Sequence, residues 1–240
     1  MKKNVLYAAV AILAGSPCFA IEPQLTGFPF TNEDLTYRIN LPTGQQIGNG
    51  HLRASRSGRD WNFELAIDGG IPGYAVNDVY KGVSNADFCS SEFSKNVTHG
   101  SRKGIENDTV DRASATASRK TVLNGGGKSE FPVPDCARDA LGLLFYARRE
   151  LGQGRVAPSQ QMLFGSLYFT QITYTGPETI QFGGKATVTD RVVVNVKGPA
   201  SSRQFEILFA RDAARTPLLF RVPLLQGASQ ITKFTMELVR

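Results

Sequence analysis

The sequence is poor in the side chains that usually bind metal ions. It has 240 residues but only two histidines and three cysteines. The histidines, His51 and His99, are far apart and belong to no His-x-x-x-His or Cys/His pattern, whereas a protein zinc site needs three or four such ligands. We therefore expect no bound metal, and we interpret each histidine as a surface or strand residue.

Motifs for catalysis and cofactor binding are also missing. The chain has no Gly-x-Ser-x-Gly elbow and no Gly-x-Gly-x-x-Gly fingerprint. The segment 125–129 resembles a phosphate-binding loop only superficially. Val122 stands where its first glycine is required, and Pro132 and Pro134 follow where a helix is needed. We predict a flexible hairpin loop there, no cofactor and no identifiable catalytic residue.

Some carboxylates could meet across strands. Asp78 could face Asp87, and Glu106 could face Asp108 or Asp111, as a pair for acid–base catalysis requires. Spacing alone selects none of these pairs, and acidic side chains on solvated strand faces are the default interpretation. The sequence therefore leaves the ligand-binding residues unidentified.

No apolar run after residue 20 approaches the roughly twenty residues that a membrane-spanning helix requires. The first twenty residues have a basic start, an apolar run from Val5 to Ala14 and a small-residue exit at Ala20, which is the pattern of a secretory signal peptide. We predict that residues 1–20 are this signal peptide. Residues 21–240 are expected to form one soluble, β-rich periplasmic domain.

Cys18 permits a second interpretation, in which a lipoprotein peptidase cleaves before this cysteine and a lipid is attached to it. The preceding residues end in Pro17, where such peptidases usually accept a small residue. We therefore favour ordinary cleavage after Ala20 over lipid anchoring through Cys18.

The charge of the chain does not indicate a nucleic-acid-binding protein. The formal net charge is +6, and removal of Lys2 and Lys3 with the signal peptide lowers it to +4. The arginines are scattered among acidic residues, as on an ordinary solvated surface. Export makes a nucleic-acid partner still less expected, so none is predicted.

Two cysteines, Cys89 and Cys136, remain in the mature chain. An even pair in an oxidising compartment predicts a disulfide, although the sequence does not show that they are close. The alternative is a pair of redox or nucleophilic thiols. Because there is no Cys-x-x-Cys motif and no histidine near either cysteine in the sequence, we favour the disulfide.

Alternation of apolar and polar residues predicts strands along most of the mature chain. Trp61, Phe63 and Leu65 alternate with polar neighbours, which is typical of a strand with one buried face. Gly183-Gly184 predicts a two-residue hairpin between two strands. About a dozen strands are expected, at residues 35–41, 45–56, 61–67, 76–83, 91–97, 103–110, 115–123, 162–174, 178–182, 185–196, 205–209, 218–222 and 234–238.

One stretch departs from this pattern and predicts a helix over about 135–151. Asp135 is expected to be its N-cap and Gly152 a left-handed C-cap. Its apolar residues occupy every side of the helical wheel, so burial on more than one face is expected. Arg148 and Arg149, in its last turn, complement the helix dipole. We predict a mainly β fold, in which a large curved antiparallel sheet or incomplete barrel wraps around one main helix.

Three segments occur in a characteristic order: a strand from Phe30 to Leu41, a helical run from Asp139 to Arg149 and a closing unit from Phe205 to Val222, which includes Asp212 to Pro217. In this order, the chain from about Phe28 to Val239 resembles the bacterial exported family called domain of unknown function 3108. The resemblance implies a periplasmic, mainly antiparallel β protein. It implies no catalytic residue and does not extend to the disulfide.

The leading functional hypothesis is a non-enzymatic envelope protein whose curved sheet binds a lipid, a glycolipid or another amphipathic molecule. The alternative is a structural or assembly factor that recruits a protein or glycan partner through an exposed strand edge. A hydrolase ranks last, because the sequence supplies no recognisable set of catalytic groups. Whether the interior is open or packed is not determined by the sequence, and neither is the oligomeric state.

Overall fold

The computed structural model describes residues 28–123, 126–198, 202–226 and 230–239. The predicted signal peptide, its cleavage site and Cys18 lie outside these ranges. Within them the chain forms one sheet of fifteen strands and one helix, which confirms the predicted fold class. No helix in this part of the chain is long and apolar enough to cross a bilayer.

The elements follow the chain in a simple succession, with the helix between the ninth and tenth strands. They are β1 (Asn32–Asn40), β2 (Gln46–Ser57), β3 (Asp60–Ile71), β4 (Tyr74–Ser84), β5 (Ser90–His99), β6 (Arg102–Asp111), β7 (Thr116–Thr121), β8 (Gly127–Pro132), β9 (Arg138–Asp139), α1 (Ala140–Gly152), β10 (Gln160–Leu163), β11 (Leu167–Phe182), β12 (Lys185–Lys197), β13 (Ser202–Ala210), β14 (Pro217–Gln226) and β15 (Gln230–Leu238).

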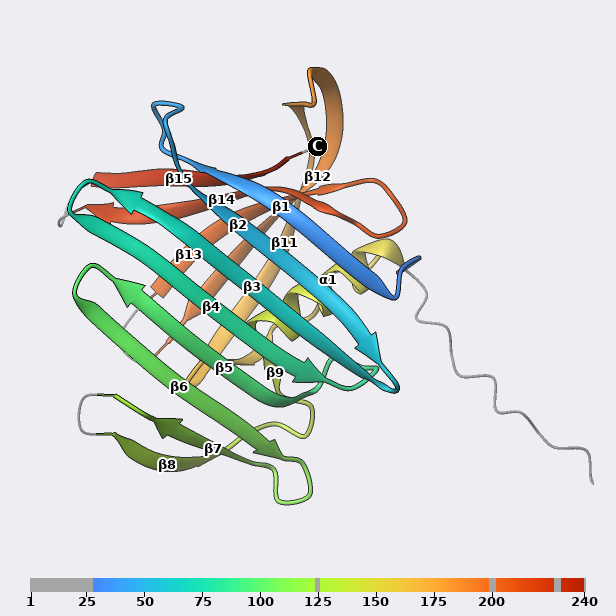
Figure 1. The fold of residues 1–240 in the computed structure, drawn as a ribbon. Helices are drawn as coiled ribbons and strands as arrows, with labels where there is room; N and C mark the ends of the chain where they lie inside the picture. Colours follow the sequence, from blue (N-terminus) through green and yellow to red (C-terminus); the bar gives the residue numbers. More distant parts are fainter. Residues whose placement is uncertain (1–27, 124–125, 199–201, 227–229, 240) are drawn as a thin grey trace, which may run out of the picture.

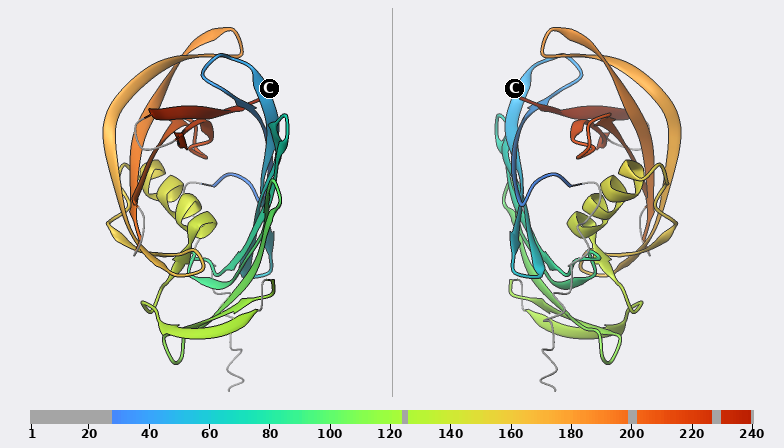
Figure 2. Two further views of the ribbon diagram at one scale, coloured as in Figure 1. Left: turned by 90° about the vertical axis from the view of Figure 1, so that its left-hand side faces the viewer. Right: turned by 90° about the vertical axis from the view of Figure 1, so that its right-hand side faces the viewer.

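The sheet is open and strongly curved. Its strand order is β8-β7-β6-β5-β4-β3-β2-β1-β15-β14-β13-β12-β11-β10-β9, so β8 and β9 are its edges. All neighbouring strands are antiparallel except β9 and β10, which are parallel. Two walls therefore face each other with α1 between them (Figure 1 and Figure 2). We call β1 to β5 the N-terminal wall and β10 to β14 the C-terminal wall.

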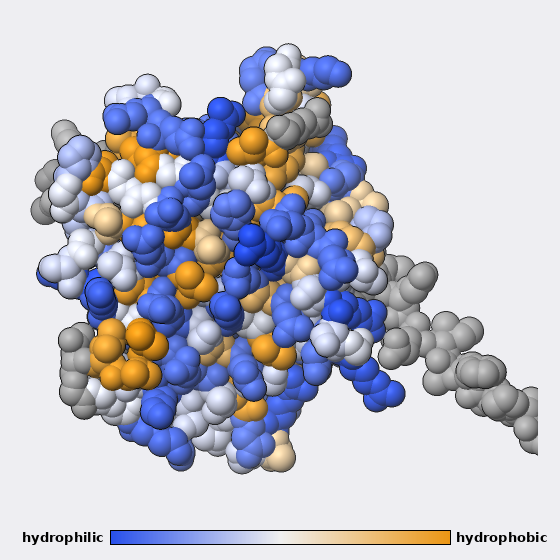
Figure 3. Space-filling view, in the orientation of Figure 1, coloured by the Kyte–Doolittle hydropathy of each residue, from blue (hydrophilic) through white to orange (hydrophobic). Residues whose placement is uncertain are grey.

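Side-chain alternation determines which face of each wall is buried. In β3, Trp61 and Phe63 are buried, whereas Asn62 and Glu64 are partly exposed. Figure 3 shows the outer face of the N-terminal wall, over which hydrophilic residues predominate. On the inner side, Phe145 of α1 stacks on Phe63 with ring centroids 4.4 Å apart. Other residues of α1 pack against the C-terminal wall, so the helix is buried on more than one face.

The strand pattern is close to the prediction, with three main differences. The predicted strand 162–174 is divided into β10 and β11 by a tight turn at Gly165, which has a φ of 73°. The predicted strand 178–182 is not separate, because β11 continues through it to Phe182. The third difference is β8, a strand in a segment expected only to lead into the helix. The predicted hairpin at Gly183 and Gly184 is confirmed, with φ values of 57° and 75° that glycine adopts without steric cost.

The N-cap of the helix is Asp139, so the prediction of Asp135 was wrong. Oδ1 of Asp139 accepts hydrogen bonds from the backbone N–H groups of Leu141 at 2.8 Å and Gly142 at 2.9 Å. Arg138 and the cap residue Asp139 itself are extended, because they form β9 and pair with β10. Pairing with a distant strand therefore overrides the local helix signal.

The C-terminal end of the helix also differs from the prediction. Gly152 is the last helical residue, and Gln153 is the C-cap with a φ of −94°, so the expected left-handed cap at Gly152 was wrong. The left-handed residue is Gly154, with a φ of 73°. Its N–H donates to the carbonyl of Leu151 at 3.0 Å, which satisfies one of the last carbonyls of the helix.

Arg148 is fully buried and, besides its place near the end of the helix, has side-chain partners that the sequence did not indicate. Its two terminal nitrogens bind the carboxylate of Glu33 at 2.7 and 2.8 Å, and its Nε donates to the carbonyl of Ala214 at 3.0 Å. The guanidinium also lies over the ring of Phe145, 4.7 Å from its centroid. Each of the three guanidinium nitrogens of this buried cation therefore has a hydrogen-bond partner.

Ser90 and Asp139 connect the N-terminal wall to the start of the helix. The Ser90 hydroxyl donates to Oδ2 of Asp139 at 2.6 Å, and the N–H of Asp139 donates back to Ser90 Oγ at 2.7 Å. The N–H of Ser90 donates to the carbonyl of Ala137 at 2.8 Å. We call this contact between β5 and residues 136–139 the seam, because it brings the two walls together where the sheet is not closed.

The disulfide lies beside the seam. It joins Cys89, just before β5, to Cys136, with Cα atoms 4.8 Å apart. The helix predicted over about 135–151 would place Cys136 in its first turn. This was wrong, because Cys136 lies before both β9 and α1. The disulfide therefore anchors the segment that leads into the helix and not the helix itself.

Replacing both Cys89 and Cys136 with serine should lower the free energy of unfolding by about 4 kcal/mol, because the loop of 47 residues between them is no longer closed in the unfolded chain. Thermal unfolding under non-reducing conditions is the measurement. The same reductant that lowers the melting temperature of the wild type should leave the double variant unchanged. Equal melting temperatures of the two proteins without reductant would contradict this.

Asp139 should make stability depend on pH in mildly acidic solution. Burial raises the pKa of its carboxyl to about 6, although Ser90 and the amides of Gly142 and Leu141 partly offset this effect. Because the folded pKa exceeds the unfolded one, the contribution is fully present below about pH 4 and is lost as the pH rises through about 6.

The matched comparison is Asp139→Asn, whose amide does not titrate. The wild type should lose about 3 kcal/mol of unfolding free energy relative to this variant between about pH 4 and pH 7. Urea unfolding of both proteins across that range measures the difference, in which the other carboxylates cancel. Parallel pH profiles would show that Asp139 is already ionised throughout the range.

Candidate functional site

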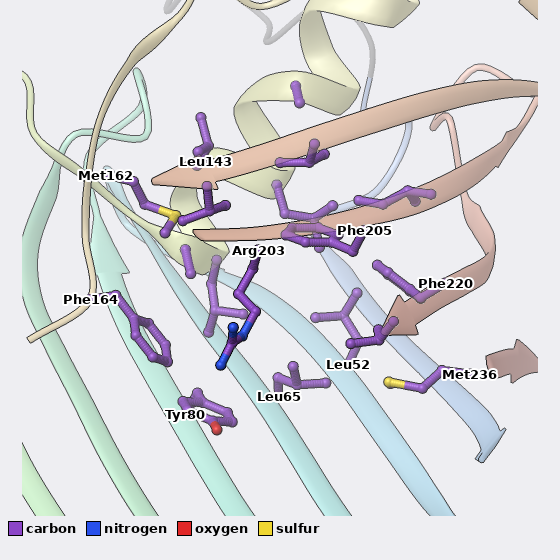
Figure 4. A pocket seen from close by; sticks show the side chains of 18 of the residues that line it. Leu52, Leu65, Tyr80, Leu143, Met162, Phe164, Arg203, Phe205, Phe220 and Met236 are labelled. Atoms are coloured by element: carbon purple, nitrogen blue, oxygen red, sulfur yellow. The ribbon is translucent and has the colours of Figure 1, made fainter. Parts of the chain in front are cut away.

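A cavity of about 650 Å³ lies between the helix and the two walls. Leu52 and Leu65 line it from the N-terminal wall, Leu143 from α1, and Val194 and Phe205 from the C-terminal wall. Figure 4 shows labelled side chains from these elements turned toward the same space. The cavity therefore occupies the part of the interior that the helix leaves unfilled.

The alternation of the strands makes the lining apolar. In β12, Val192, Val194 and Val196 are buried and line the cavity, while the residues between them point to the other face. No aspartate, glutamate or lysine lines the cavity within the part of the chain that the structure describes. Its chemistry is that of a site that excludes water from an apolar ligand and binds it by burial of surface.

Two tyrosines in the lining have their hydroxyl groups occupied. Tyr37 donates to the carbonyl of Pro217 at 2.9 Å, and Tyr80 donates to Oδ2 of Asp78 at 3.0 Å. Burial raises the pKa of both tyrosines well above the ordinary range, so each remains a neutral donor at physiological pH. The Tyr37 hydroxyl links β1 to β14, whereas the Tyr80 hydroxyl binds within β4. Neither tyrosine has the lowered pKa expected of a reactive phenolate.

Of the lining residues that the structure describes, Arg203 is the one with a permanent charge, and it is exposed. It lies on β13 and pairs with Val196 of β12. Phe205 and Ile207, which follow on the same face of β13, also line the cavity. Among the described residues its guanidinium donates only to the carbonyl of the adjacent Ser202, at 3.2 Å. Figure 4 shows its side chain extending from the C-terminal wall toward Tyr80 on the opposite wall.

The turn between β10 and β11 covers one side of the cavity. The ring of Phe164 packs against Tyr80 and Phe93, with centroids 5.6 and 5.5 Å apart. The next residue, Gly165, donates its N–H to Oδ2 of Asp108 at 3.0 Å and accepts from Arg119 at 2.7 Å. These contacts join the turn to β5, β6 and β7 across the open part of the sheet.

The carboxylates considered for acid–base catalysis are engaged in separate contacts. Glu106 pairs with Lys95 at 3.0 Å. Asp108 holds the Gly165 amide, which partly offsets the effect of burial in raising its pKa. Asp111 accepts from the N–H of Ala113 in its own turn, at 2.9 Å. Glu106 and Asp108 nevertheless lie near enough for the charge of Glu106 to raise the pKa of Asp108 further, so the structure does bring this pair together. Asp111 is separated from them, because its carboxylate is engaged in its own turn.

The other proposed pair is also separated. Asp78 binds Tyr80 and His99, whereas Asp87 lies 3.5 Å from Arg149. Nε2 of His99 lies 2.9 Å from Oδ2 of Asp78, so this histidine lines the cavity with a buried partner and is more than a surface residue. Within the described ranges, no group of three His, Cys, Asp or Glu residues is arranged to bind a metal ion.

His51 and the glycine-rich loop are remote from this cavity lining. His51 is on β2, where its Nδ1 lies 3.3 Å from the Thr36 hydroxyl. The described part of the loop, from Gly126 onward, connects β7 to β8, as expected of a hairpin. The sequence did not identify Arg203, although its place in the alternation that ends with Phe205 and Ile207 was a signal that could have revealed it.

A family described as "Protein of unknown function (DUF3108)" matches residues 34–238. No curated protein matches the chain. The matched range includes every lining residue of the cavity that has been named.

Two solved structures can be aligned with most of this chain but are distant from it in sequence. The hypothetical lipoprotein YmcC from Escherichia coli K12 is 12% identical, with 90% of this chain and 87% of that chain covered and a TM-score of 0.28. A putative exported protein with a YmcC-like fold from Bacteroides fragilis is 8% identical, with 87% and 93% covered and a TM-score of 0.29. At these scores the similarity does not define the site.

Proposed function

The chain belongs to the DUF3108 family of proteins of unknown function, and within that family we propose that it is a non-enzymatic binder of a lipid or similar amphipathic molecule. The ligand would be held in the cavity between α1 and the two walls. The observation that carries this proposal is the cavity itself, with a volume of about 650 Å³ and a lining that is apolar apart from a few polar side chains.

The size of the cavity suits a long apolar chain. A water molecule, which is close in size to a methylene group, has a share of about 30 Å³ in the liquid, so the cavity holds about twenty such groups. Each methylene that leaves water contributes about 0.8 kcal/mol. Protein interiors are otherwise close-packed, so a space of this size favours a role in binding.

The proposed compartment is the periplasm. The disulfide between Cys89 and Cys136 supports an oxidising, extracytoplasmic location. The predicted signal peptide at residues 1–20 supports the same location. Lipid attachment at Cys18 would place the same domain at a membrane surface, and the proposed cavity function is compatible with either arrangement.

The alternative function, recruitment of a partner by strand addition, finds less support. The edge strand β8 has only six residues and carries Lys128 and Pro132. A short edge with lysine and proline is a common device against pairing with a further strand. The other edge, β9, has two residues. We therefore propose ligand binding and not edge pairing.

Filling the cavity should abolish binding without unfolding the protein. Ile172 lines the cavity and is only half-buried, so Ile172→Trp adds volume there with limited overpacking. We expect the affinity for the neutral fluorescent probe N-phenyl-1-naphthylamine to fall by at least about tenfold, or about 1.4 kcal/mol. Fluorescence titration of the purified mature protein gives the affinities.

The matched control is Val188→Trp, on β12 of the same hairpin, where Val188 is 46% exposed and is not a cavity residue. This variant should bind the probe as the wild type does, and both variants should melt cooperatively. Native mass spectrometry of wild-type protein extracted gently from membranes should also show a co-purifying amphiphile. A wild type that neither binds the probe nor carries an amphiphile would refute the proposed function.

A further inference from the structure

Arg203 places a permanent positive charge on a wall of the cavity that is otherwise apolar. Alternation along β13 turns Arg203, Phe205, Ile207 and Phe209 to the same face, and all four line the cavity. Arg203 is exposed, whereas Ile207 and Phe209 are buried, so the arginine lies at the solvent-facing end of this row of lining residues. A head group bound there would remain near water while an apolar chain entered the interior.

Neighbouring arginines of the C-terminal wall have carboxylate partners. Arg191 lies 3.1 Å from Glu206, Arg215 lies 2.6 Å from Asp190, and Arg221 lies 2.6 Å from Glu178. A further arginine, the one at position 211, lies 2.8 Å from the same aspartate as Arg215. Each of these four arginines therefore forms a salt bridge with an aspartate or a glutamate.

Arg203 has no such partner among the described residues. Its hydrogen bond to the Ser202 carbonyl uses one of the five donors of the guanidinium, and none of the described lining residues is acidic. His99, the other basic residue in the lining, is already bound to Asp78. The guanidinium therefore offers its remaining donors to an anionic group, for which its planar fork is well suited.

We propose that the ligand is a single-chain amphiphile with an anionic head group, and that Arg203 binds this head group. The inference rests on the proposed function and adds the chemical class of the ligand to it. The apolar chain then runs from Arg203 along the C-terminal wall toward α1. A carboxylate and a phosphate monoester share the required chemistry, which is a compact group of anionic oxygens.

The depth of the cavity fits a single extended chain. Arg203 and Phe209 are six residues apart on β13, which corresponds to about 20 Å along a strand. Phe209 belongs to the same apolar cluster as Leu143 and Leu151 of the helix. This length and the volume of about twenty methylene-sized groups both correspond to one long acyl chain.

Competition against bound N-phenyl-1-naphthylamine tests the head group directly. The competitors are palmitate, hexadecyl phosphate and the neutral hexadecanol, each below its aggregation concentration and at low ionic strength. For the wild type, at least one anionic competitor should bind at least about tenfold more tightly than hexadecanol. The preferred anion identifies the source of the charge as a fatty carboxylate or a phosphate head group.

Arg203→Gln should remove this preference while leaving the affinity for the neutral probe within about twofold of the wild type, and Arg203→Lys should retain part of it. The control is Arg38→Gln. Arg38 is exposed on β1 between the buried residues Tyr37 and Ile39, so it points to the outer face. This control should keep the full preference.

Equal displacement by hexadecanol and by both anions in the wild type would overturn the proposed head group, and so would an anion preference that persists in Arg203→Gln. In either case, probe binding that Ile172→Trp abolishes would still support the cavity function. If the wild type binds neither the probe nor any competitor, the cavity function and the head-group assignment both fail. The two proposals are thus separable in one set of titrations.

Discussion

The arrangement of the interior depends on the hydrogen bonds that the buried carboxyl group of Asp139 accepts. This group caps α1, accepts a hydrogen bond from Ser90 and belongs to a residue that also pairs with β10. The space around it is fully used, because a Cβ on Gly82 would lie 2.8 Å from its Oδ2. The position of the helix between the walls is therefore fixed at this point, and the remaining volume becomes the cavity.

Periodicity predicted many of the strands because one face of such a strand is buried and the other faces solvent. Trp61 and Phe63 show this in β3, and the hairpin was predicted from its glycine pair, Gly183 and Gly184. The helix start was predicted wrongly because Asp135 and Asp139 are equally good caps locally. Only pairing of β9 with β10, which is a contact with residues far along the chain, decides between them.

The site was less predictable than the fold, for a related reason. Arg148 follows the apolar run of the helix and Arg203 precedes the alternating residues Phe205 and Ile207, yet one arginine is fully buried against Glu33 and the other lines a cavity. Glu33 is 115 residues away from Arg148 in the chain, so no local pattern reveals the pair. Likewise, valines that line a cavity and valines that fill a core have the same period, because alternation reports which face is inside and not how full the interior is.

The strand order has a consequence for how the molecule assembles. β1 and β15 are adjacent in the sheet, with Tyr37 opposite Leu238, so the pairing that unites the two halves joins opposite ends of the chain. Each half can form its own hairpins in sequence, but the walls enclose an interior only after the last strand has been delivered. Such long-range closure gives a high contact order and slow folding. Until then the apolar inner faces stay exposed, and among the described residues the disulfide between Cys89 and Cys136 is the one covalent cross-link that limits the conformations of the unfolded chain.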